Sequence, residues 1–424
     1  MHPKPLLEAC ADLVALVLKF EHPSDAVVAR FFRENRSLGP RERATLSETV
    51  YTVLRKKQLF DHLAPSGSGA KSRRMAILGF PGGRDYLNAA LNDQEIRWLD
   101  ACGAIRPDDL MERHRHNLPD WLAQILKDEV QQDFWPLVDS LNAPVTTLDL
   151  RVNTFKAKRP DVQKALSKAG VRSMATPYSP WGLRIEGKPA LGRVEAFLDG
   201  SIEVQDEGSQ LLALLLDAHR GEMVVDFCAG AGGKTLALGA AMRNTGRLYA
   251  FDTSGHRLDA LRPRLARSGL SNVHPVAISH ERDDRIKRLA GKIDRVLVDA
   301  PCSGLGTLRR SPDLKWRQSL EQVRQMAAKQ LEILQSAARL LKPGGRLVYA
   351  TCSVLNMENE EVANAFGTSN TDFEVLDAGQ LLAAMGVDNA IDLCRRDAKG
   401  ATFLRLWPHR HATDAFFAAV WRKV

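Results

Sequence analysis

The chain has 424 residues, 44% of them hydrophobic, so it can bury substantial cores and form two or three domains. No apolar run approaches the roughly 20 residues of a membrane helix, and the N-terminus lacks a signal-peptide profile. We therefore expect a cytoplasmic globular protein with no membrane partner. The net charge of +8 favours a polyanionic partner such as nucleic acid but does not decide the matter.

Widely scattered cysteines are a second general feature of the chain. They are Cys10, Cys102, Cys228, Cys302, Cys352 and Cys394. Because no two of them form a Cys-x-x-Cys pair, the spacing argues against a zinc site and against a disulfide framework. We expect reduced thiols and no metal. Cys10, Cys102 and Cys394 are interpreted as inert, buried hydrophobic residues.

The first 140 residues are predicted to be helical, because they contain no convincing strand alternation. Pro40 is typical of the first turn of a helix, and a helix is predicted over residues 43–63. Within it, Leu46, Val50 and Val53 recur at steps of three and four, as they do on the buried face of a helix. The pattern predicts an all-α domain over residues 1–140.

A small α+β module is predicted over residues 144–220. Residues 146–152 and 183–186 have strand character, and residues 161–169 form a short helix. The module contains many cations, namely Arg151, Lys156, Lys158, Arg159, Lys164, Lys168 and Arg172. They make it a candidate for RNA contact. At its end, Ser209 is predicted to cap an apolar helix over residues 210–217.

From Gly221 onward strands alternate with helices, which is typical of a doubly wound parallel sheet. The predicted strands are 223–227, 247–252, 273–278, 294–299 and 346–350. A long helix is expected to run from residue 320 to residue 341 and to stop at Lys342-Pro343-Gly344-Gly345. The apolar runs 402–407 and 416–421 predict a C-terminal hairpin. This third domain spans residues 221–424.

A glycine-rich loop follows the first of these strands. It reads Cys228-Ala229-Gly230-Ala231-Gly232-Gly233-Lys234-Thr235 and opens a helix, whose N-terminus offers free amide donors to a ligand. An ATPase is disfavoured, because its phosphate loop would need glycine at position 228. Asp252 ends the second strand, where a carboxylate can reach the ribose of an adenosine-containing cofactor or cap the next helix.

Two cysteines follow two other strands of the same sheet. They lie in Asp299-Ala300-Pro301-Cys302-Ser303-Gly304 and in Ala350-Thr351-Cys352-Ser353. Because parallel strands end in one ligand-binding crevice, both thiols could face one substrate. A thiol attacks as the thiolate and benefits from nearby positive charge. Candidate sources of this charge are Lys234, Arg309 and Arg310.

Both cysteine motifs make the chain resemble the RNA cytosine-5 methyltransferases of the Nop2/Sun type, which modify ribosomal RNA. The resemblance rests on residues 299–316, which end in Pro312-Asp313-Leu314-Lys315-Trp316, on Tyr349-Ala350-Thr351-Cys352-Ser353 and on Asn359-Glu360-Glu361. It extends to the glycine loop and to Val204-Gln205-Asp206-Glu207-Gly208-Ser209-Gln210. In addition, Leu38-Gly39-Pro40-Arg41-Glu42-Arg43 is similar to the NusB-type domain of bacterial 16S rRNA enzymes.

The resemblance implies a multi-domain fold. It comprises an all-α NusB-like domain (1–140), a small α+β RNA-binding module (144–220) and a Rossmann-like class I methyltransferase domain (221–424). The implied cofactor is S-adenosylmethionine. The residues expected to bind it are Cys228, Ala229, Gly230, Ala231, Gly232, Gly233, Lys234, Asp252 and Asp299.

The resemblance also implies a reaction that uses both thiols. Cys352 would add to C6 of cytosine, which activates C5 to accept the methyl group. Cys302 would assist loss of the C5 proton and release of the enzyme. Asp299 would hydrogen-bond the cytosine ring, and Lys234 would orient the base.

The substrate implied is RNA in a single-stranded or loop region, because the target base must be unstacked. We expect 16S rRNA as the substrate and a monomeric enzyme. One alternative is a transfer RNA cytosine-5 methyltransferase. Another is a non-catalytic RNA-binding factor for ribosome assembly, against which the joint presence of both thiols, Asp299 and Lys234 argues.

The chain departs from the family's pattern in its cofactor region. Gly230-Ala231 stands where Ala-Pro is common. The acidic residue expected near the adenine, after the third strand, is replaced around Ser279-His280. Asp283 and Asp284 are the candidates to substitute for it.

Overall fold

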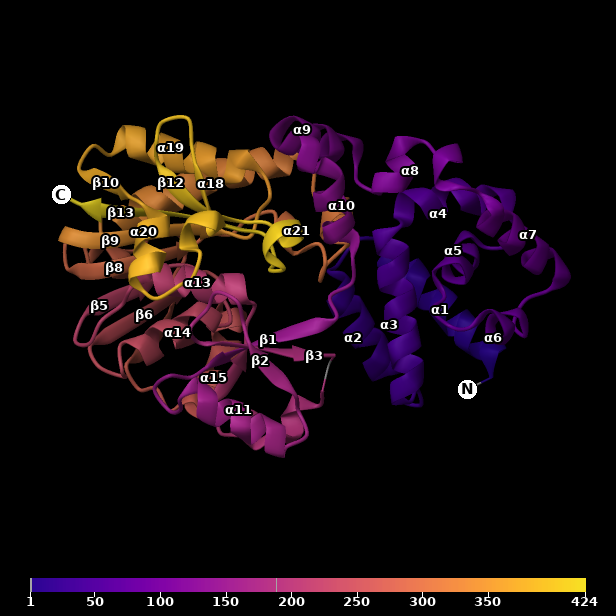
Figure 1. Ribbon diagram of the computed structural model, residues 1–424, viewed down its shortest axis with the longest axis horizontal. Coiled ribbons are helices and arrows are strands. Elements are labelled where there is room, and N and C mark those ends of the chain that lie inside the picture. The colour runs from indigo at the N-terminus through magenta and orange to yellow at the C-terminus, as the bar shows by residue number, and fades with distance from the viewer. Residues whose placement is uncertain (1, 188) are drawn as a thin grey trace. The chain divides into compact units, whose positions relative to one another are not determined.

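The computed structural model describes residues 2–187 and 189–424 (Figure 1). The chain forms two compact units: unit 1 comprises residues up to Pro144 together with Thr307–Leu320, and unit 2 comprises Val145–Gly306 and Glu321–Val424. The chain therefore leaves unit 2 after Gly306 and returns to it at Glu321. None of the helices in the described part of the chain has the length and apolar character needed to cross a bilayer.

Unit 1 is helical. Its α-helices are α1 (Pro3–Val17), α2 (Ser24–Glu34), α3 (Pro40–Arg55), α4 (Lys57–Leu63), α5 (Lys71–Gly79), α6 (Arg84–Asn88), α7 (Asp93–Ala104), α8 (Glu112–His116), α9 (Asp120–Val130), α10 (Phe134–Asn142) and α17 (Leu314–Arg317). Pro40 occupies the first turn of α3, as predicted. The single helix predicted over residues 43–63 is wrong, because the backbone at Lys56 leaves the helical region (φ −108°, ψ 24°) and separates α3 from α4.

The core of unit 1 forms where α1, α3 and α5 pack together. Leu7 and Leu13 of α1, Leu46 and Leu54 of α3 and Met75 of α5 are all fully buried there. The helical spacing of three and four residues puts these side chains on one face of each helix. The hydrophobic effect of this burial accounts for the helices even where their termini lack side-chain caps.

The inserted segment 307–320 is built into unit 1 by buried polar contacts. The Asp313 carboxylate accepts hydrogen bonds from the Ser24 amide (3.1 Å) and from the Ser24 hydroxyl (2.7 Å). The indole Nε1 of Trp316 donates to the Leu54 carbonyl at 2.7 Å. These groups come from positions more than 250 residues apart in the chain.

Lys315 is the most deeply buried cation of this segment, with 1% of its surface exposed. Its Nζ donates to the Arg55 carbonyl (3.0 Å) and to Oδ1 of Asn142 (2.7 Å), both of which are neutral acceptors. Burial lowers the pKa of Lys315 well below its ordinary value, and the charge of Arg55 lowers it further.

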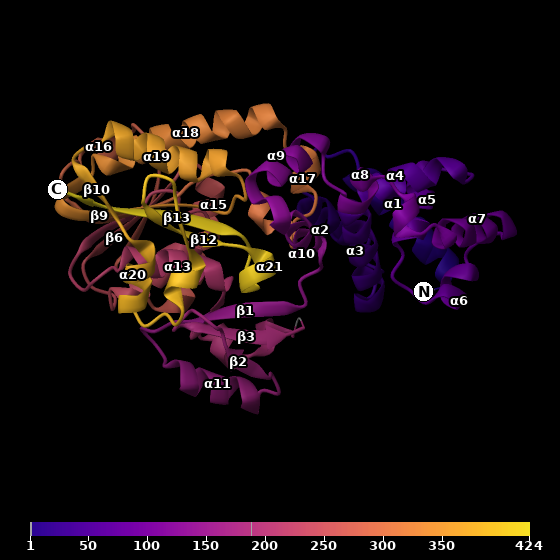
Figure 2. The same cartoon turned by 45° about the horizontal axis from the view of Figure 1, so that its top comes forward.

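Unit 2 begins with the small module, an antiparallel sheet in the order β2-β3-β1-β4 (Figure 2). Its elements are β1 (Thr147–Val152), α11 (Arg159–Lys168), β2 (Ser173–Ala175), β3 (Gly182–Glu186), α12 (Glu195–Leu198) and β4 (Ile202–Val204). Leu150 and Leu183 of the sheet and Leu166 of α11 form its buried core. The predicted strands and helix are present, and the short strands β2 and β4 add to them.

The rest of unit 2 is a mixed sheet in the order β11-β12-β13-β9-β8-β5-β6-β7, with β10 paired to β13. Its strands are β5 (Met223–Asp226), β6 (Arg247–Asp252), β7 (Val273–Ala277), β8 (Ile293–Asp299), β9 (Leu341–Thr351), β10 (Phe373–Leu376), β11 (Cys394–Arg396), β12 (Thr402–Leu406) and β13 (Phe416–Lys423). Strands β5 to β9 are mutually parallel, and β12 and β13 form the predicted antiparallel C-terminal hairpin. The chain order reverses between β5 and β8.

Helices cover both faces of this sheet (Figures 1 and 2). One face packs against α13 (Glu207–Leu216), α14 (Gly233–Ala241), α15 (Gly255–Ser268) and α20 (Ala378–Ala384). The other packs against α16 (Asp284–Lys287), α18 (Leu320–Ala338) and α19 (Glu360–Ser369). Val224 faces the first core and Val225 the second, because side chains of a strand alternate. The sheet is a Rossmann-like three-layer fold.

Two local predictions in unit 2 are wrong. The long helix α18 ends at Ala338, and Leu341 begins β9 instead of closing the helix. The cap of α13 is Asp206, whose carboxylate accepts from the Gly208 amide, so Ser209 is not the cap. Asp206 is the N-cap residue because it immediately precedes Glu207, the first residue of the helix.

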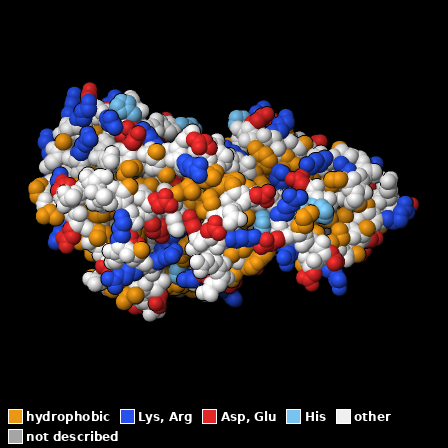
Figure 3. Space-filling model, turned by 90° about the horizontal axis from the view of Figure 1, so that it is seen from above, with side chains coloured by type: hydrophobic (Ala, Val, Ile, Leu, Met, Phe, Trp, Pro, Cys, Tyr) orange, Lys and Arg blue, Asp and Glu red, His pale blue; other side chains and the backbone are white. Residues whose placement is uncertain are grey.

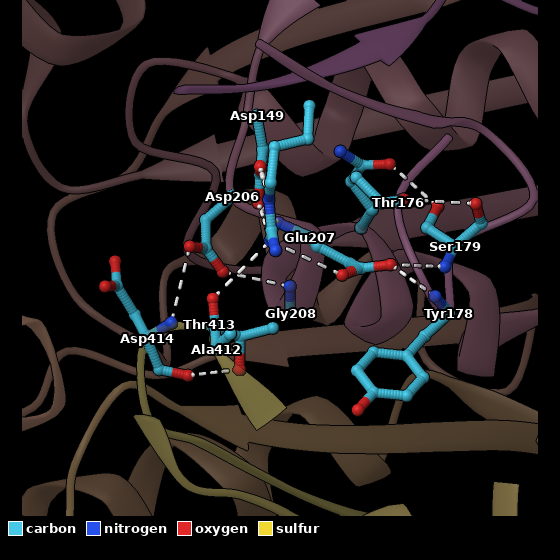
Figure 4. A network of polar contacts seen from close by, with 12 residues as sticks. Asp149, Thr176, Tyr178, Ser179, Asp206, Glu207, Gly208, Ala412, Thr413 and Asp414 are labelled. Carbon is cyan, nitrogen blue, oxygen red and sulfur yellow. Dashed lines mark hydrogen bonds and ion pairs between the residues drawn. The ribbon is translucent and has the colours of Figure 1, made fainter. Parts of the chain in front are cut away.

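A buried polar network joins the small module to the larger three-layer fold within unit 2 (Figure 4). The Glu207 carboxylate accepts from the amides of Tyr178 (2.6 Å) and Ser179 (2.7 Å). Arg184 of β3 forms two hydrogen bonds with Asp149 of β1, at 2.6 and 2.9 Å. The residues of the motif 204–210 thus fasten the module at the start of α13.

Candidate active site

Functional side chains gather at the carboxyl ends of the central parallel strands. The glycine loop follows β5, Asp252 ends β6, and Asp299 ends β8. Cys352 directly follows β9, which is paired with β8. The reversal of strand order between β5 and β8 opens a crevice of the kind in which such sheets bind ligands.

The glycine loop has a backbone that other residues would not allow. Gly230 and Gly232 have positive φ values of 55° and 82°. A side-chain carbon on Gly232 would lie 2.1 Å from Leu261, so glycine lets α14 and α15 pack closely. At Gly230 and Gly233 the same carbon would meet no atom closer than 3.7 Å, so these backbones face open space that a ligand can enter.

Asp252 connects the glycine loop to the end of β6. One carboxylate oxygen accepts from the Gly230 amide at 2.8 Å, and the other accepts from the Ser254 amide at 2.7 Å. Ser254, and not Asp252, caps α15. Asp252 therefore holds the predicted cofactor loop in place instead of serving as a helix cap.

Asp226 at the end of β5 is a buried carboxyl group that the sequence did not single out. It is 1% exposed and accepts a hydrogen bond from the Thr235 hydroxyl at 2.7 Å. Burial raises its pKa to about 7, although the bond from Thr235 acts in the opposite direction. The nearby charge of Asp299 raises it further.

The two predicted thiols lie in contact, with 3.3 Å between Sγ of Cys302 and Sγ of Cys352. Gly306 fixes this arrangement, because its amide donates to the Cys352 carbonyl at 2.8 Å. Its carbonyl accepts from the amide of Ala415. A side-chain carbon on Gly306 would lie 2.6 Å from the Cys352 carbonyl, so only glycine permits this approach.

Lys234 and Asp299 form an ion pair beside the thiols, with 2.7 Å between Nζ and Oδ2. Burial alone would lower the pKa of Lys234, but the charge and hydrogen bond of Asp299 outweigh it, so the pKa is raised. Negative charge on Cys352 raises the pKa of Lys234 as well. By reciprocity, the ammonium group stabilises a thiolate at Cys352.

The pKa of Cys302 is raised well above its ordinary value, first by its hydrogen bond with Cys352 and then by burial. Either sulfur of the pair could be the hydrogen-bond donor in this contact. Burial also raises the pKa of Cys228 well above its ordinary value, with the charge of Asp226 adding to the effect. Cys228 is therefore a poor nucleophile within the glycine loop.

Several candidates from the sequence have other surroundings. Arg309 and Arg310 belong to unit 1, whereas Lys234 supplies positive charge within the unit that holds the thiols. Asp283 caps α16 and accepts from the Ser279 amide at 3.0 Å, so its carboxylate is occupied by the loop after β7. Asp284 pairs with Lys287 on the surface. Among residues 2–187 and 189–424, no cluster of His, Cys, Asp and Glu could hold a metal ion.

Sequence reasoning did not identify a further set of site residues, a buried polar cluster behind the thiols. It comprises Ser303, Gln330, Tyr349, Thr351, Ser353, Glu358 and Asn359. A serine directly after each cysteine was the available signal.

Comparison with known proteins agrees with this architecture. Residues 213–422 match the family model described as 16S rRNA methyltransferase RsmB/F, and residues 118–191 match its ferredoxin-like domain. A Synechocystis protein named probable ribosomal RNA small subunit methyltransferase B is 31% identical over 310 residues, which are 73% of this chain and 67% of that relative.

Solved structures show the same fold. The crystal structure of PH0851 superposes with a TM-score of 0.81 at 27% identity and covers 100% of this chain and 99% of its own. NSun6 from Pyrococcus horikoshii, solved with SFG, shares the fold at 22% identity, with a TM-score of 0.63 over 72% of this chain and 98% of its own.

Fold and site together define a Rossmann-like methyltransferase with a ferredoxin-like domain and a helical N-terminal region. The chain belongs to the RsmB/F family of RNA methyltransferases, and S-adenosylmethionine is its cofactor. The open backbones at Gly230 and Gly233, beside the Asp252 carboxylate, fit such a ligand.

Proposed function

We propose that the protein methylates C5 of a cytosine in RNA through a covalent bond between Cys352 and C6 of the base. The observation that carries the proposal is the 3.3 Å separation of two thiols from the ends of neighbouring strands. The order of the roles, in which Cys352 attacks and Cys302 assists release, is the one that the resemblance implied.

The reaction begins at Cys352. C5 of cytosine is a weak nucleophile, and addition of the Cys352 thiolate to C6 turns the C5–C6 bond into an enamine-like system that can take a methyl group. Covalent addition thereby splits one difficult step into easier ones. Lys234 favours the thiolate electrostatically, and Asp299, which it pairs with, is positioned to hydrogen-bond the ring.

Cys302 acts after the methyl group has been transferred. The proton on C5 must leave before Cys352 can be expelled and the double bond restored. Cys302 lies beside Cys352 and, as a thiolate, would accept this proton, while the electrons of the C5–H bond restore the C5–C6 double bond and the C6–S bond breaks to return the Cys352 thiolate. Without it, the enzyme should stay bonded to the RNA.

The methyl group comes from S-adenosylmethionine, which when bound supplies an electrophilic carbon. Residues 228–234 would hold it through their backbone, together with Asp252 and Asp299. The structure of Pyrococcus horikoshii NSun6 was solved with SFG, an analogue of this cofactor. It supports the proposal that the same fold binds S-adenosylmethionine here. The half-buried Cys228 lines the loop without entering the reaction.

Trapping of the covalent intermediate tests the mechanism. Cys302→Ala should accumulate a protein–RNA adduct that survives a denaturing gel, because attack proceeds and release fails. Cys352→Ala should give neither adduct nor methyl transfer while it still binds RNA. Cys394→Ala, which removes a thiol of β11 that faces α20, is the matched control and should behave like the wild type.

Two results would contradict the mechanism. Near-normal turnover of Cys352→Ala would remove it as the nucleophile. Normal release without an adduct in Cys302→Ala would remove the second role. A stable adduct in Cys352→Ala would require a different attacking group.

The proposed substrate is 16S rRNA, with a single-stranded or loop cytosine as the target. The family model and the named relatives support this choice. Lys and Arg are intermingled with Asp and Glu on the face shown in Figure 3, so RNA contact is proposed for the exposed cations of the small module, such as Lys158 and Lys164, and not for that face as a whole. Arg151 is wrong as a candidate for RNA contact, because it is 2% exposed and its guanidinium donates to Gln205. Bisulfite mapping of total RNA from cells without the gene should reveal one lost methylcytosine, and its loss from tRNA would favour the alternative.

The remaining expectations belong to the same proposal. Unit 1 would serve as a NusB-like domain that helps select the RNA. The enzyme would act as a monomer in the cytoplasm. Gel filtration with light scattering measures the oligomeric state, and a mass twice that of the chain would contradict a monomer.

A further inference from the structure

A single buried carboxylate touches both cysteine loops from behind. Glu358 lies in a short turn, Asn356–Glu358, and its side chain is completely buried. Oε1 accepts from the Ser303 amide (2.8 Å) and from Nε2 of Gln330 (3.0 Å). Oε2 accepts from the hydroxyls of Ser303 and Ser353. Four donors therefore converge on this one group.

The two serines occupy equivalent positions in the two loops. Ser303 directly follows Cys302, and Ser353 directly follows Cys352. Each hydroxyl accepts from the amide two residues further on, at 3.4 Å in the first loop and 3.1 Å in the second. Each then donates to the same oxygen of Glu358. The loops after β8 and β9 thus share one anchor.

The surroundings of Glu358 hold that anchor still. Gln330 of α18 reaches past it to donate to the Pro301 carbonyl at 2.9 Å. Asn359 donates from Nδ2 to the Ser353 carbonyl at 3.0 Å. Both amide side chains are fully buried, so water does not compete for these bonds. The cluster fixes the backbone on both sides of the thiol pair.

Burying a carboxylate in this place is costly, because a charge leaves water for a medium of low polarity. Hydrophobic side chains of similar volume would pack the two loops at less cost if packing were the only requirement. Hydrogen bonds, unlike apolar contacts, fix direction as well as distance. A reaction in which two sulfur atoms act on one base requires both sulfur positions to be fixed in this way.

We propose that Glu358 is a positioning residue, which sets the separation of Cys302 and Cys352 through Ser303 and Ser353. This inference rests on the proposed two-thiol reaction. The hydrogen bonds of Glu358 go to Ser303, Ser353 and Gln330, so its effect on the positions of the sulfur atoms is transmitted through the two serines. Its charge also raises the pKa of Cys302. A shift of about 1 Å in either loop can lower the rate of a reaction roughly a hundredfold.

Serine-to-alanine and glutamate variants test the proposal. Ser303→Ala and Ser353→Ala each remove one arm of the anchor, and Glu358→Ala removes it entirely. Glu358→Gln can keep the bonds at Oε1, and its amino group can donate to the two serine hydroxyls. Ser336→Ala is the matched control, because it removes a buried serine bond to the Glu281 carbonyl near the C-terminal end of α18.

One readout reports the thiol pair without any catalysis. The azo oxidant diamide takes up two hydrogen atoms as the Cys302 and Cys352 thiols form a disulfide, and peptide mass spectrometry measures the rate of that link. It should form fastest in the wild type, Ser336→Ala and Glu358→Gln, and roughly tenfold or more slowly in the other variants. A second readout is methyl transfer, where kcat should fall roughly 10- to 100-fold with little change in KM.

The two readouts separate this proposal from the reaction on which it rests. Unchanged disulfide rates in Glu358→Ala and Ser353→Ala would overturn the positioning role, whatever their activity. Slowed disulfide formation together with full activity in Cys352→Ala would leave the positioning role standing and overturn the two-thiol reaction. Equal losses in Ser336→Ala would also overturn the proposal, since any buried serine would then have the same effect.

Discussion

Both units bury a lysine, and the two lysines face opposite surroundings. Lys234 in unit 2 lies 2.7 Å from the Asp299 carboxylate. Lys315 in unit 1 donates to two neutral acceptors, the Arg55 carbonyl and the amide oxygen of Asn142. Burial lowers the pKa in both places, but only at Lys234 do carboxylate charges reverse the shift.

The difference indicates a role in the reaction for Lys234 and a structural role for Lys315. Around Lys234 the carboxylates of Asp299 and Asp226 stabilise the ammonium group and offset the loss of its hydration. The hydrogen-bond partners of Lys315 carry no charge, so nothing there offsets the lowering of its pKa by burial, and the group serves as a hydrogen-bond anchor. Burial alone therefore says little about the role of a lysine, and its partners say more.

Lys234→Met should have the largest effect. Without the cation, Asp299 is left as an unpaired charge, and a thiolate at Cys352 loses its electrostatic support. We expect kcat for methyl transfer to fall by about two to three orders of magnitude. Single-turnover rates with a 16S rRNA fragment measure this.

Lys315→Met is the comparison variant for that experiment. At a temperature where it stays folded, its rate should remain within about threefold of the wild type, since a small change in packing costs less than a lost catalytic charge. Equal losses of methyl-transfer rate in Lys234→Met and Lys315→Met would contradict the distinction between the two lysines.

Asp226 should give the next largest effect, on stability. Its pKa of about 7 lies above the ordinary value of 3.8, so between these values the folded protein binds more protons than the unfolded chain. Stability contributed by this group is therefore complete below pH 3.8 and is lost as the pH rises to about 7. Urea unfolding of unit 2 at a series of pH values should show a loss of a few kcal/mol.

Asp226→Asn is neutral at every pH and should remove this part of the pH dependence while it still accepts the Thr235 bond. An unchanged slope in this variant would mean that other groups cause it. Thr235→Val tests the bond itself and should lower stability at all pH values.

Lys315 should give the smallest effect, with the opposite sign of pH dependence. Because its folded pKa lies below the value of the unfolded chain, the unfolded chain binds more protons in between, and the stability of unit 1 should rise with pH through that window. Lys315→Met should abolish the rise and cost about 1 to 2 kcal/mol, since the Arg55 carbonyl and Asn142 lose their donor. Pulsed hydrogen exchange of α3 after urea treatment, with all pulses at one pH, measures this.

Much of the methyltransferase fold could be predicted from the sequence, because its strands are apolar runs bounded by glycine and aspartate. The predicted run 247–252 coincides with β6, and the thiols were expected together since parallel strands end at one edge. Short strands escaped prediction. Three residues, as in β2 (Ser173–Ala175), are too few for alternation to be seen.

The missed features depend on contacts between distant residues. Glu358 lies in a turn of polar sequence, which predicts a solvent-exposed side chain. Its burial depends on two serines from separate loops, which only the folded chain brings against it. The break at Lys56 separates two helices that share one apolar pattern. The membership of residues 307–320 in unit 1 is set by Asp313 and Trp316, whose partners precede them by more than 250 positions.

The path of the chain through residues 307–320 bears on how the protein can have evolved and how it can be divided. A version that starts at Val145 would keep Asp313 and Trp316 but lose Ser24 and Leu54, which hydrogen-bond to them, so the indole would be left exposed and could promote aggregation. A helical domain merely added in front of a finished enzyme would not need that enzyme's loop in its own core. Helices and loop are therefore expected to have changed together, so that a substitution in one is answered by a substitution in the other.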